Sequence, residues 1–433
     1  MVVHPRYRWF VVGVFFVFLL LHQADLLLIG PLTTPIMEEF HIDEEQMGRV
    51  FTGALLVGAV FYPLWGYLYD RYARAKLLAL ASLIWGSTTW LNAVARTYPA
   101  FLVTRATTGI DNSSYPGLFS LVADYFGPHV RGKVYGFLQV TQPLGFLLGT
   151  VLALSLRDVA GVGWRGVFYI TGGMGVLVAI LIFFGVREAP RGGSEPELAN
   201  LEHLGTYKFS WKIARQLFRK PSLLLLFTQG FFGVFPWNVI ASWFFRYLET
   251  ERHYSPDRVL VTMVPAVLVL AAGYFVGGAA GDLLFRRTPR GRLIVSTVAV
   301  LIGAILLPLT LSVPVDNQGL FLVMMCLTAL FIPFASANVI STVYDISLPE
   351  VRSTAIAMES FIESAGPALA PWLAGAIAVG SSLQNAILVI CVSAWLLGAF
   401  FLAIATYLVP RDIAMLRAQL RERAEHEQHL ASA

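Results

Sequence analysis

The chain has 433 residues, of which 57% are apolar and 13% are charged, and its formal net charge is +4. Soluble proteins contain roughly 25% charged residues, so this composition excludes an ordinary water-soluble domain and indicates lipid as the main solvent. The two cysteines, Cys326 and Cys391, lie in apolar runs and offer neither a disulfide framework nor a metal cluster. The small positive excess does not suggest nucleic acid as a partner.

Long apolar runs dominate the chain from its start. The first run lacks the short apolar region and the small-residue cleavage site of a secretory signal, so we expect it to be a transmembrane helix. A span needs about 20 mainly apolar residues. Twelve segments meet this requirement: residues 8–37, 46–69, 76–95, 99–126, 131–156, 164–186, 222–248, 258–284, 292–312, 318–345, 352–378 and 384–409.

The longest polar stretch divides the twelve segments six and six. We therefore expect an all-α membrane protein with twelve transmembrane helices in two pseudo-symmetric six-helix bundles. The expected parts are an N-terminal bundle (1–187), a cytoplasmic linker with a short amphipathic helix (188–221), a C-terminal bundle (222–410) and a cytoplasmic tail (411–433). Within the linker, residues 210–220 read SWKIARQLFRK, a basic amphipathic pattern expected to lie at the inner headgroups or to act as a simple tether.

The distribution of basic residues predicts the orientation. Of the 31 lysines and arginines, one, Arg105, lies in the interior of a span. Seven others lie in the loops or at the span ends on the side opposite the N-terminus: Arg49, Arg96, Arg157, Arg165, Arg246, Arg252 and Arg258. Because cytoplasmic loops carry an excess of lysine and arginine, we expect both termini and the central loop to be cytoplasmic. The expected location is the cell (inner) membrane.

Two internal repeats indicate a duplication. Residues 124–131 read DYFGPHVR and residues 345–352 read DISLPEVR, so an acid and an arginine recur at one spacing between long apolar runs. Likewise, the GYLYD of residues 66–70 is echoed by the GAAGD of residues 278–282. Repeats of this kind mark transporters that rock two halves around a central site.

The loop after the second span carries a recognisable motif. Residues 66–76 read GYLYDRYARAK, which resembles the G-x-x-x-D-R-x-x-R/K signature of the major facilitator superfamily at the family's position between spans two and three. The resemblance implies a twelve-helix transporter fold with a cytoplasmic gate built at this loop and at its counterpart in the second half. The residues implied are Gly66, Asp70, Arg71, Arg74, Asp124, Arg131, Asp282, Asp345 and Arg352.

The physical interpretation of this motif is a latch. Gly66 would permit a close helix approach, and Asp70 can accept hydrogen bonds from the N-terminus of a neighbouring helix. The basic residues of the motif can pair with Asp124 or with carbonyl groups at helix ends. The alternative is that they are ordinary cytoplasmic charges, which would not explain the glycine–aspartate spacing in both halves.

Ionisable groups inside a membrane are costly and are functional candidates by default. The candidates are His22 and Asp25 in the first span, Arg105, Asp111 and Asn112 in the fourth, and Glu359 and Glu363 in the eleventh. At about 100° per residue, Arg105 and Asn112 fall about 20° apart on one helix face. Asp111 lies about 120° from Arg105 unless the helix bends, so we expect it to face a different neighbour.

The eleventh span brings two acids together. Glu359 and Glu363 are four residues apart and share one helix face. Two carboxylates so close in a low dielectric do not both ionise easily, so one is expected to hold a proton near neutral pH. The alternative is a wet vestibule without a coupling role. For Asp25 and Arg105 the alternative is a structural ion pair, and for His22 it is a packing role.

The first and fourth spans carry a second resemblance. Asp25 and the segment 104–115, TRATTGIDNSSY, resemble the spinster-like branch of the superfamily, with Asn112 where that branch has a glutamate. Aligned instead on Pro116 and Gly117, Asp111 falls on the acid of the anion:cation symporter branch. Both resemblances imply an acid–arginine pair in the N-terminal half that governs proton coupling or substrate binding.

Three classes of function compete. A membrane enzyme needs a catalytic set, but no H-E-x-x-H or G-x-S-x-G motif occurs. A sensor that binds without transport differs from a transporter only in uptake. The absence of a P-loop motif excludes ATP as the direct energy source, so an ion gradient or the substrate's own gradient is expected to drive transport, without a cofactor. We favour proton-linked movement of a small anionic or amphiphilic molecule, because Arg105 is a natural anion partner. Export of lysolipid-like or drug-like amphiphiles is the alternative, and we expect a monomer in the lipid bilayer.

Overall fold

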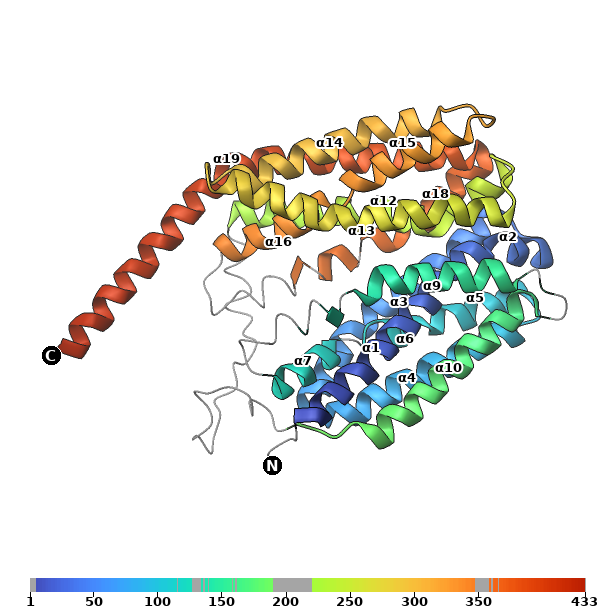
Figure 1. The fold of residues 1–433 in the computed structure, drawn as a ribbon, viewed down its shortest axis with the longest axis horizontal. Helices are drawn as coiled ribbons and strands as arrows, with labels where there is room; N and C mark the ends of the chain where they lie inside the picture. The colour runs from blue at the N-terminus through green and yellow to red at the C-terminus, as the bar shows by residue number, and fades with distance from the viewer. Residues whose placement is uncertain are drawn as a thin grey trace. The chain divides into compact units, whose positions relative to one another are not determined.

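The computed structural model describes residues 5–114, 116–126, 134, 137–138, 140–157, 159, 162–189, 220–346, 358–359, 361–364 and 366–432. Within these ranges the side chains of residues 5, 70, 71, 116, 123, 337, 344, 417 and 419–432 are outside the description. The described residues form helices and no strand (Figure 1).

Helices run through both halves of the chain. The helices of the first half are α1 (Pro5–Leu27), α2 (Ile29–Phe40), α3 (Glu44–Arg71), α4 (Arg74–Val94), α5 (Tyr98–Thr107), α6 (Gly109–Asn112), α7 (Pro116–Tyr125), α9 (Thr141–Leu156) and α10 (Gly163–Gly185). Those of the second half are α12 (Pro221–Thr250), α13 (Pro256–Phe285), α14 (Gly291–Leu311), α15 (Gln318–Phe331), α16 (Phe334–Ile346), η3 (Pro367–Leu369), α18 (Ala370–Gly380) and α19 (Leu383–Ser432).

The helices account for the predicted spans. In the part of the chain that the structure describes, ten helical segments are long and apolar enough to cross a membrane, and α9 is a shorter apolar helix. The predicted fourth span is covered by the three consecutive pieces α5, α6 and α7. The predicted fifth span, 131–156, is described mainly through α9, because Arg131 and most residues up to 139 lie outside the described set.

The chain forms two compact units, each described here by itself. The first comprises Met1–Thr206, Val239–Val261 and Ala368–Ala386, and the second comprises Tyr207–Asn238, Thr262–Pro367 and Ile387–Ala433. In the first unit, α4 packs on α10, α1 on α9, and α3 on both α5 and α18. In the second unit, α14 packs against α15 and α16. The first unit therefore includes the ends of α12 and α13 that meet at residues 251–255, together with α18.

The helix breaks in the first unit have local causes. The first predicted span divides at Leu28, where α1 ends and α2 begins. Pro31 lies just beyond the break and has no backbone N–H to continue the ladder. The fourth predicted span divides at Thr108 and again after Asn112, before Pro116, which also lacks an N–H. Backbone groups exposed at such breaks need neighbours, so these are positions where polar side chains can gather.

Gly109, the first residue of α6, sets how closely the broken segment approaches α3. A Cβ at this position would lie 2.2 Å from the carbonyl oxygen of Ala54 and 2.7 Å from the backbone nitrogen of Gly58. Both distances are far shorter than a van der Waals contact, so the approach requires glycine. The contact holds the broken segment against α3.

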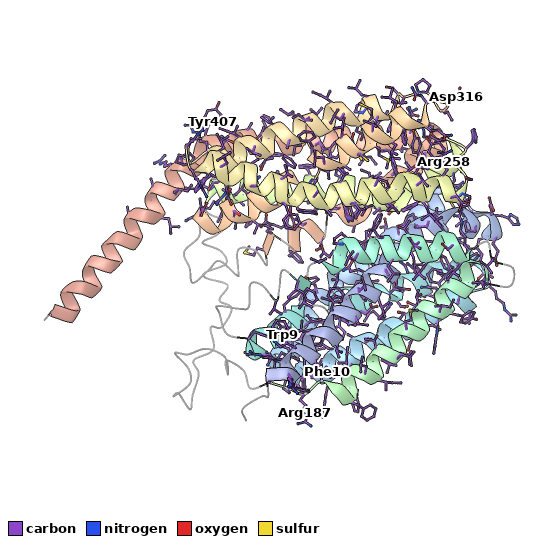
Figure 2. The ribbon with its side chains drawn as sticks, in the orientation of Figure 1. Trp9, Phe10, Arg187, Arg258, Asp316 and Tyr407 are labelled. Atoms are coloured by element: carbon purple, nitrogen blue, oxygen red, sulfur yellow. The ribbon has the colours of Figure 1, made fainter. Side chains whose placement is uncertain are left out.

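Large apolar side chains point outward along the helices of both units (Figure 2). Phe184 on α10, Phe275 on α13 and Tyr407 on α19 are among the most exposed. Soluble proteins rarely expose apolar surface on this scale. The outer faces of the helices are therefore suited to lipid.

Candidate functional site

A buried polar cluster lies inside the first unit, where α1, α4, α5 and α6 meet. Its ionisable members are His22, Asp25, Arg105 and Asp111, whose relative exposures are 4%, 3%, 2% and 1%. Burial of charged groups is strongly unfavourable unless they are paired or hydrogen-bonded. The contacts of each member therefore decide what the cluster can do.

His22 and Asp111 form a direct pair. His22 Nε2 on α1 lies 2.8 Å from Asp111 Oδ2 on α6. The imidazole ring stacks on Phe18, with ring centroids 5.7 Å apart, and lies edge-on to Trp85 at 5.4 Å. Asp111 Oδ1 is buried and has no hydrogen-bond partner among the described residues. The helix breaks at Thr108, between Arg105 and Asp111, so the expectation based on a continuous helix does not apply. The neighbour that the structure gives Asp111 is His22.

Asp25 is held by two donors from α4. Its Oδ2 accepts hydrogen bonds from Trp85 Nε1 and from Thr89 Oγ1, both at 2.9 Å. Its Oδ1 is buried without a described partner. Trp85 and Thr89 are four residues apart and therefore share one helix face. Sequence reasoning missed both, because aromatic residues and threonines are common in any span.

Arg105 is buried but incompletely paired. Its Nη2 donates to the carbonyl oxygen of Leu26 at 3.2 Å, just after the acid of α1. Its Nε and Nη1 have no hydrogen-bond partner within the described ranges. Arg105 interacts electrostatically with both Asp25 and Asp111, but the structure records no ion pair of 4 Å or less with either of them among the described residues. The structural ion pair considered for Asp25 and Arg105 is therefore not seen.

The remaining intramembrane candidates have no recorded contact with this cluster among the described residues. Asn112 is half-buried on α6 and faces Gly58 of α3. Glu359 and Glu363 belong to the second unit, where Glu359 is buried. A Cβ on Gly230 of α12 would lie 2.8 Å from Glu363 Oε1, so the glycine leaves room for that carboxylate.

Of the predicted gate residues of the first half whose side chains are described, Arg74 at the start of α4 makes the most contacts. Arg74 pairs with Asp124 at 2.5 Å and with Glu188 at 2.8 Å, and it also donates to Ser120 and to the carbonyl oxygen of Ala189. Glu188 Oε2 in turn accepts from the backbone N–H of Ala75. Glu188 was not predicted, although it follows the sixth span directly. The close approach expected at Gly66 is not seen, since a Cβ there would meet no described atom within 4 Å.

The second half repeats the arrangement around Arg292. Its Nη2 lies 2.7 Å from Asp282 Oδ1, and its Nη1 pairs with Asp345. The acid that begins each repeated segment, Asp124 or Asp345, thus pairs with an arginine in the first turn of an earlier helix, α4 or α14. The side chains of Asp70 and Arg71, and all of Arg131 and Arg352, lie outside the described residues.

A second polar network occupies the end of the first unit that carries the turn 41–43, the α2–α3 end. Glu249 on α12 accepts from Arg157 Nη2 and from Thr34 Oγ1, both at 2.5 Å. Arg246 of α12 pairs with Glu44 of α3 at 2.8 Å. Sequence reasoning missed these pairs, because each arginine looks like an ordinary loop charge.

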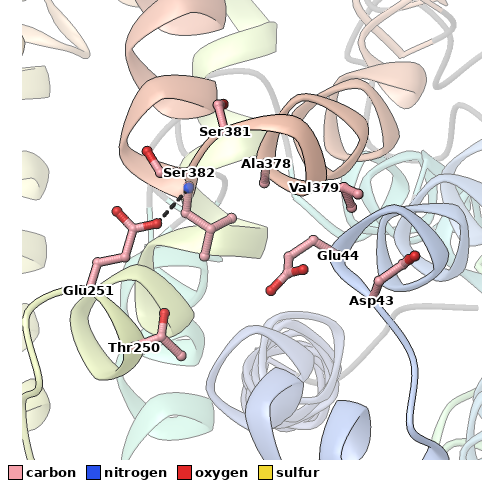
Figure 3. A pocket seen from close by; sticks show the side chains of 9 residues that line it. Asp43, Glu44, Thr250, Glu251, Ala378, Val379, Ser381 and Ser382 are labelled. Carbon is pink, nitrogen blue, oxygen red and sulfur yellow. Dashed lines mark hydrogen bonds between the residues drawn. The ribbon is translucent and has the colours of Figure 1, made fainter.

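The backbones of α3 and α18 meet at this end. A Cβ on Gly375 would lie 2.2 Å from the carbonyl oxygen of Glu44, and one on Gly48 would lie 2.8 Å from that of Pro371. A pocket of about 550 Å³ opens beside this contact, lined by Asp43, Glu44 and Glu251 among others (Figure 3). Its carboxylates have structural partners: Asp43 caps α3, and Glu251 accepts from the first backbone N–H groups of α19. No group of metal-ligating side chains occurs in the described part of the chain.

The comparison with protein families decides the class. The model of the Major Facilitator Superfamily matches residues 14–345. The chain belongs to this superfamily. Membership confirms the resemblance carried by the 66–76 motif, and the all-helical structure agrees with the expected fold class.

Curated relatives include transporters of two kinds. The chain is 28% identical over 388 residues to Protein spinster of Drosophila melanogaster, an alignment that covers 86% of this chain and 62% of the relative. The chain thus spans less than two thirds of that protein's length. It is also 28% identical over 377 residues to the cis,cis-muconate transport protein of Acinetobacter baylyi, covering 85% of this chain and 87% of the relative.

Solved structures agree on the fold. A bacterial homologue of the human lysosomal transporter Spinster, in an inward-facing and unoccupied conformation, matches with a TM-score of 0.79 and 20% identity. The match covers 96% of this chain and 99% of that one. A D-xylose–proton symporter matches with a TM-score of 0.71 and 16% identity, covering 90% and 97% of the two chains. The relatives and structural neighbours are membrane transporters rather than enzymes.

Proposed function

We propose that this chain is a secondary transporter that moves a small anionic or amphiphilic solute across the membrane by alternating access, coupled to protons. The observation that supports the proposal best is Arg105. Its guanidinium is almost fully buried in the first unit, with two nitrogens that have no hydrogen-bond partner among the described residues. A buried cation with unused donors is suited to an anionic ligand.

The charge balance of the cluster links the anion to a proton. Two acids, Asp25 and Asp111, accompany the single arginine, so the cluster carries an excess negative charge when both acids are ionised and His22 is neutral. An added anion would increase that excess in a low dielectric, where like charges repel strongly. A proton bound in the cluster offsets the charge that the anion brings. Uptake of the anion with a proton is therefore favoured over uptake of the anion alone.

The direction of the helices follows from the loop charges. With the N-terminus, the central loop and the C-terminus in the cytoplasm, the α2–α3 end faces outward. The network of Glu249, Arg157, Glu44 and Arg246 then lies at the outer side, and the Arg74 and Arg292 networks lie at the inner side. The cell membrane is the expected location.

Export of lysolipid-like or drug-like amphiphiles is the second candidate. It is favoured by the match to Protein spinster and by the similar segment 104–115. The match to the muconate transport protein favours the organic anion. A sensor that binds without transport is the alternative of another class.

Uptake into proteoliposomes tests the proposal. The purified chain is reconstituted, a proton gradient is imposed, and the uptake of radiolabelled cis,cis-muconate and of a labelled lysophospholipid is measured with and without an uncoupler. The Arg105→Ala variant should lose transport about tenfold to a hundredfold, because a hydrogen bond to a charged group contributes about 1.5–3 kcal/mol. Arg105→Lys is the matched control that retains the charge but not the planar fork.

The outcomes separate the alternatives. Uncoupler-sensitive uptake of muconate supports the anion, and gradient-driven movement of the lysophospholipid supports the amphiphile. Binding without uptake of either probe would indicate a sensor. Wild-type uptake by Arg105→Ala would remove Arg105 from the mechanism.

A further inference from the structure

A pairing of helix segments in the first unit brings His22 and Asp111 together, although they stand far apart in the sequence. We propose that His22 and Asp111 form one proton site that binds and releases a single proton during transport. The proposal rests on the proton coupling proposed above and names the residues that carry it. In this proposal Asp25 does not carry the proton but remains the acceptor of hydrogen bonds from Trp85 and Thr89.

The charges around the pair can be counted. Among the described residues, the charged groups that face it are Asp25 on α1 and Arg105 on α5. The packed helix α9 contains no ionisable residue, and the charged residues of α3, α4 and α10 lie towards their helix ends. Tyr69 of α3 lies near Ser114 and is an uncharged phenol at neutral pH. The cluster thus holds two carboxylates, one guanidinium and one imidazole.

This count leaves room for one proton. With both acids ionised and His22 neutral, the cluster has one negative charge more than positive charge. Desolvating a net charge is costly, and neutralising it is the usual solution. One added proton makes the cluster neutral, whereas two would give it a net positive charge. The proton comes from water on one side and returns to water on the other, and the bond that forms and breaks is an N–H or an O–H bond.

The hydrogen bonds place the proton on the pair rather than on Asp25. Asp25 Oδ2 accepts from both Trp85 and Thr89, so this carboxylate already has two donors. Among the described residues, the carboxylate of Asp111 has His22 as its one hydrogen-bond partner. An imidazole can both donate and accept protons near neutral pH. The pair can therefore gain a proton as one unit, on the ring or on the carboxyl group.

The aromatic neighbours connect the pair to the rest of the cluster. The ring of His22 contacts both Phe18 and Trp85, which also contact each other. The same Trp85 donates to Asp25, one turn further along α1. A change of charge at His22 therefore reaches Asp25 through Trp85, which contacts both residues. It also weakens the electrostatic attraction of the acids for Arg105. Protonation of the pair then leaves Arg105 better able to bind an anion.

Infrared spectroscopy and uptake test the assignment independently of each other. The purified protein without substrate is titrated from about pH 5.5 to about pH 8.5, the range in which a working proton carrier exchanges. The carboxyl and imidazole bands are followed for the wild type, Asp111→Asn and His22→Gln. Both substitutions keep a hydrogen-bonding side chain of similar size. Thermal unfolding in detergent verifies that each variant is folded.

The expected spectroscopic result is one titrating site that both single variants lose. The double variant Asp111→Asn with His22→Gln should show the same loss as either single variant, because one proton is shared. In proteoliposomes these variants should flatten the pH dependence of gradient-driven muconate uptake to less than about twofold.

Contrary outcomes are equally clear. If Asp25→Asn, or Glu359→Gln combined with Glu363→Gln, removes the titrating site while Asp111→Asn and His22→Gln keep it, the assignment to the pair is overturned. Additive effects of the two single variants would also overturn it, since they would indicate two separate protons. If the wild type shows the titrating pair but no proton-driven uptake of either probe, the proposed function fails while the proton site stands.

Discussion

The ion pair between Glu249 and Arg157 should control how readily the α2–α3 end of the first unit opens. Glu249 lies on α12, and Arg157 follows α9, so the pair joins segments of the two halves of the sequence. The two side chains are only 10% and 7% exposed. Arg157 also donates to the carbonyl oxygen of Pro31 at the break between α1 and α2. In the alternating-access cycle proposed above, this contact breaks once in each cycle.

The expected size of the effect follows from burial. Removing one partner of a buried ion pair costs about 3–5 kcal/mol. Glu249→Gln keeps an oxygen that can accept from Arg157 and from Thr34, so we expect a smaller cost of about 1.5–3 kcal/mol, the value of a hydrogen bond to a charged group. At about 1.4 kcal/mol for each factor of ten, the ratio of closed to open states should fall roughly tenfold to a hundredfold.

Cysteine labelling can measure this shift. Cys326→Ser and Cys391→Ala provide a cysteine-free background. Ala374→Cys then reports opening, because Ala374 is fully buried on α18, which packs on α3. The rate of maleimide labelling at this position should rise by about the factor given above when Glu249→Gln is added.

A matched control is available in the same unit. Glu39 pairs with Arg165 at 2.6 Å, but the two side chains are 46% and 27% exposed. Exposed pairs contribute about 0–1 kcal/mol, and both residues belong to the first half of the sequence. Glu39→Gln should therefore change the labelling rate little. Equal rates for Glu249→Gln and Glu39→Gln, or an unchanged rate for Glu249→Gln, would refute the argument.

Two further variants test the packing and the inner network. Gly109→Ala should lower the free energy of unfolding by about 1–3 kcal/mol, because its Cβ would collide with the backbone of α3. Gly66→Ala is the control and should be nearly neutral, because the space there is open. Melting temperatures in detergent compare the two, and equal effects would contradict the assigned contact. Asp124→Asn should destabilise the chain by about 1.5–3 kcal/mol, because Arg74 is almost fully buried and loses an ionised partner. A wild-type melting temperature would show that Glu188 alone is enough to pair with Arg74.

Much of the fold was predictable because its signals are local. A membrane span is read from the length of an apolar run, and the turn at Pro31 or Pro116 is read from a missing N–H. The superfamily resemblance rested on the spacing of Gly66, Asp70 and Arg74 within one loop. None of these inferences requires knowledge of which helix lies beside which.

The candidate site was predicted only as a set of residues. Each member stood out because an ionisable group in an apolar run is conspicuous. Helix geometry could not identify His22 as the partner of Asp111. Nor could it identify Trp85 and Thr89 as the donors to Asp25, since neither residue type is unusual in a span.

The sequence by itself determined the apolar spans, the duplication and the intramembrane charges, because hydrophobic length and the cost of burying charge are properties of each segment alone. Only the tertiary structure decided the partners. The pairing of His22 with Asp111 and the contact of Glu249 with Arg157 arise where segments distant in the chain pack together. The same holds for the two Arg105 nitrogens that have no hydrogen-bond partner among the described residues. The free energy of a buried polar group depends on the neighbour that meets it, and packing between helices selects that neighbour.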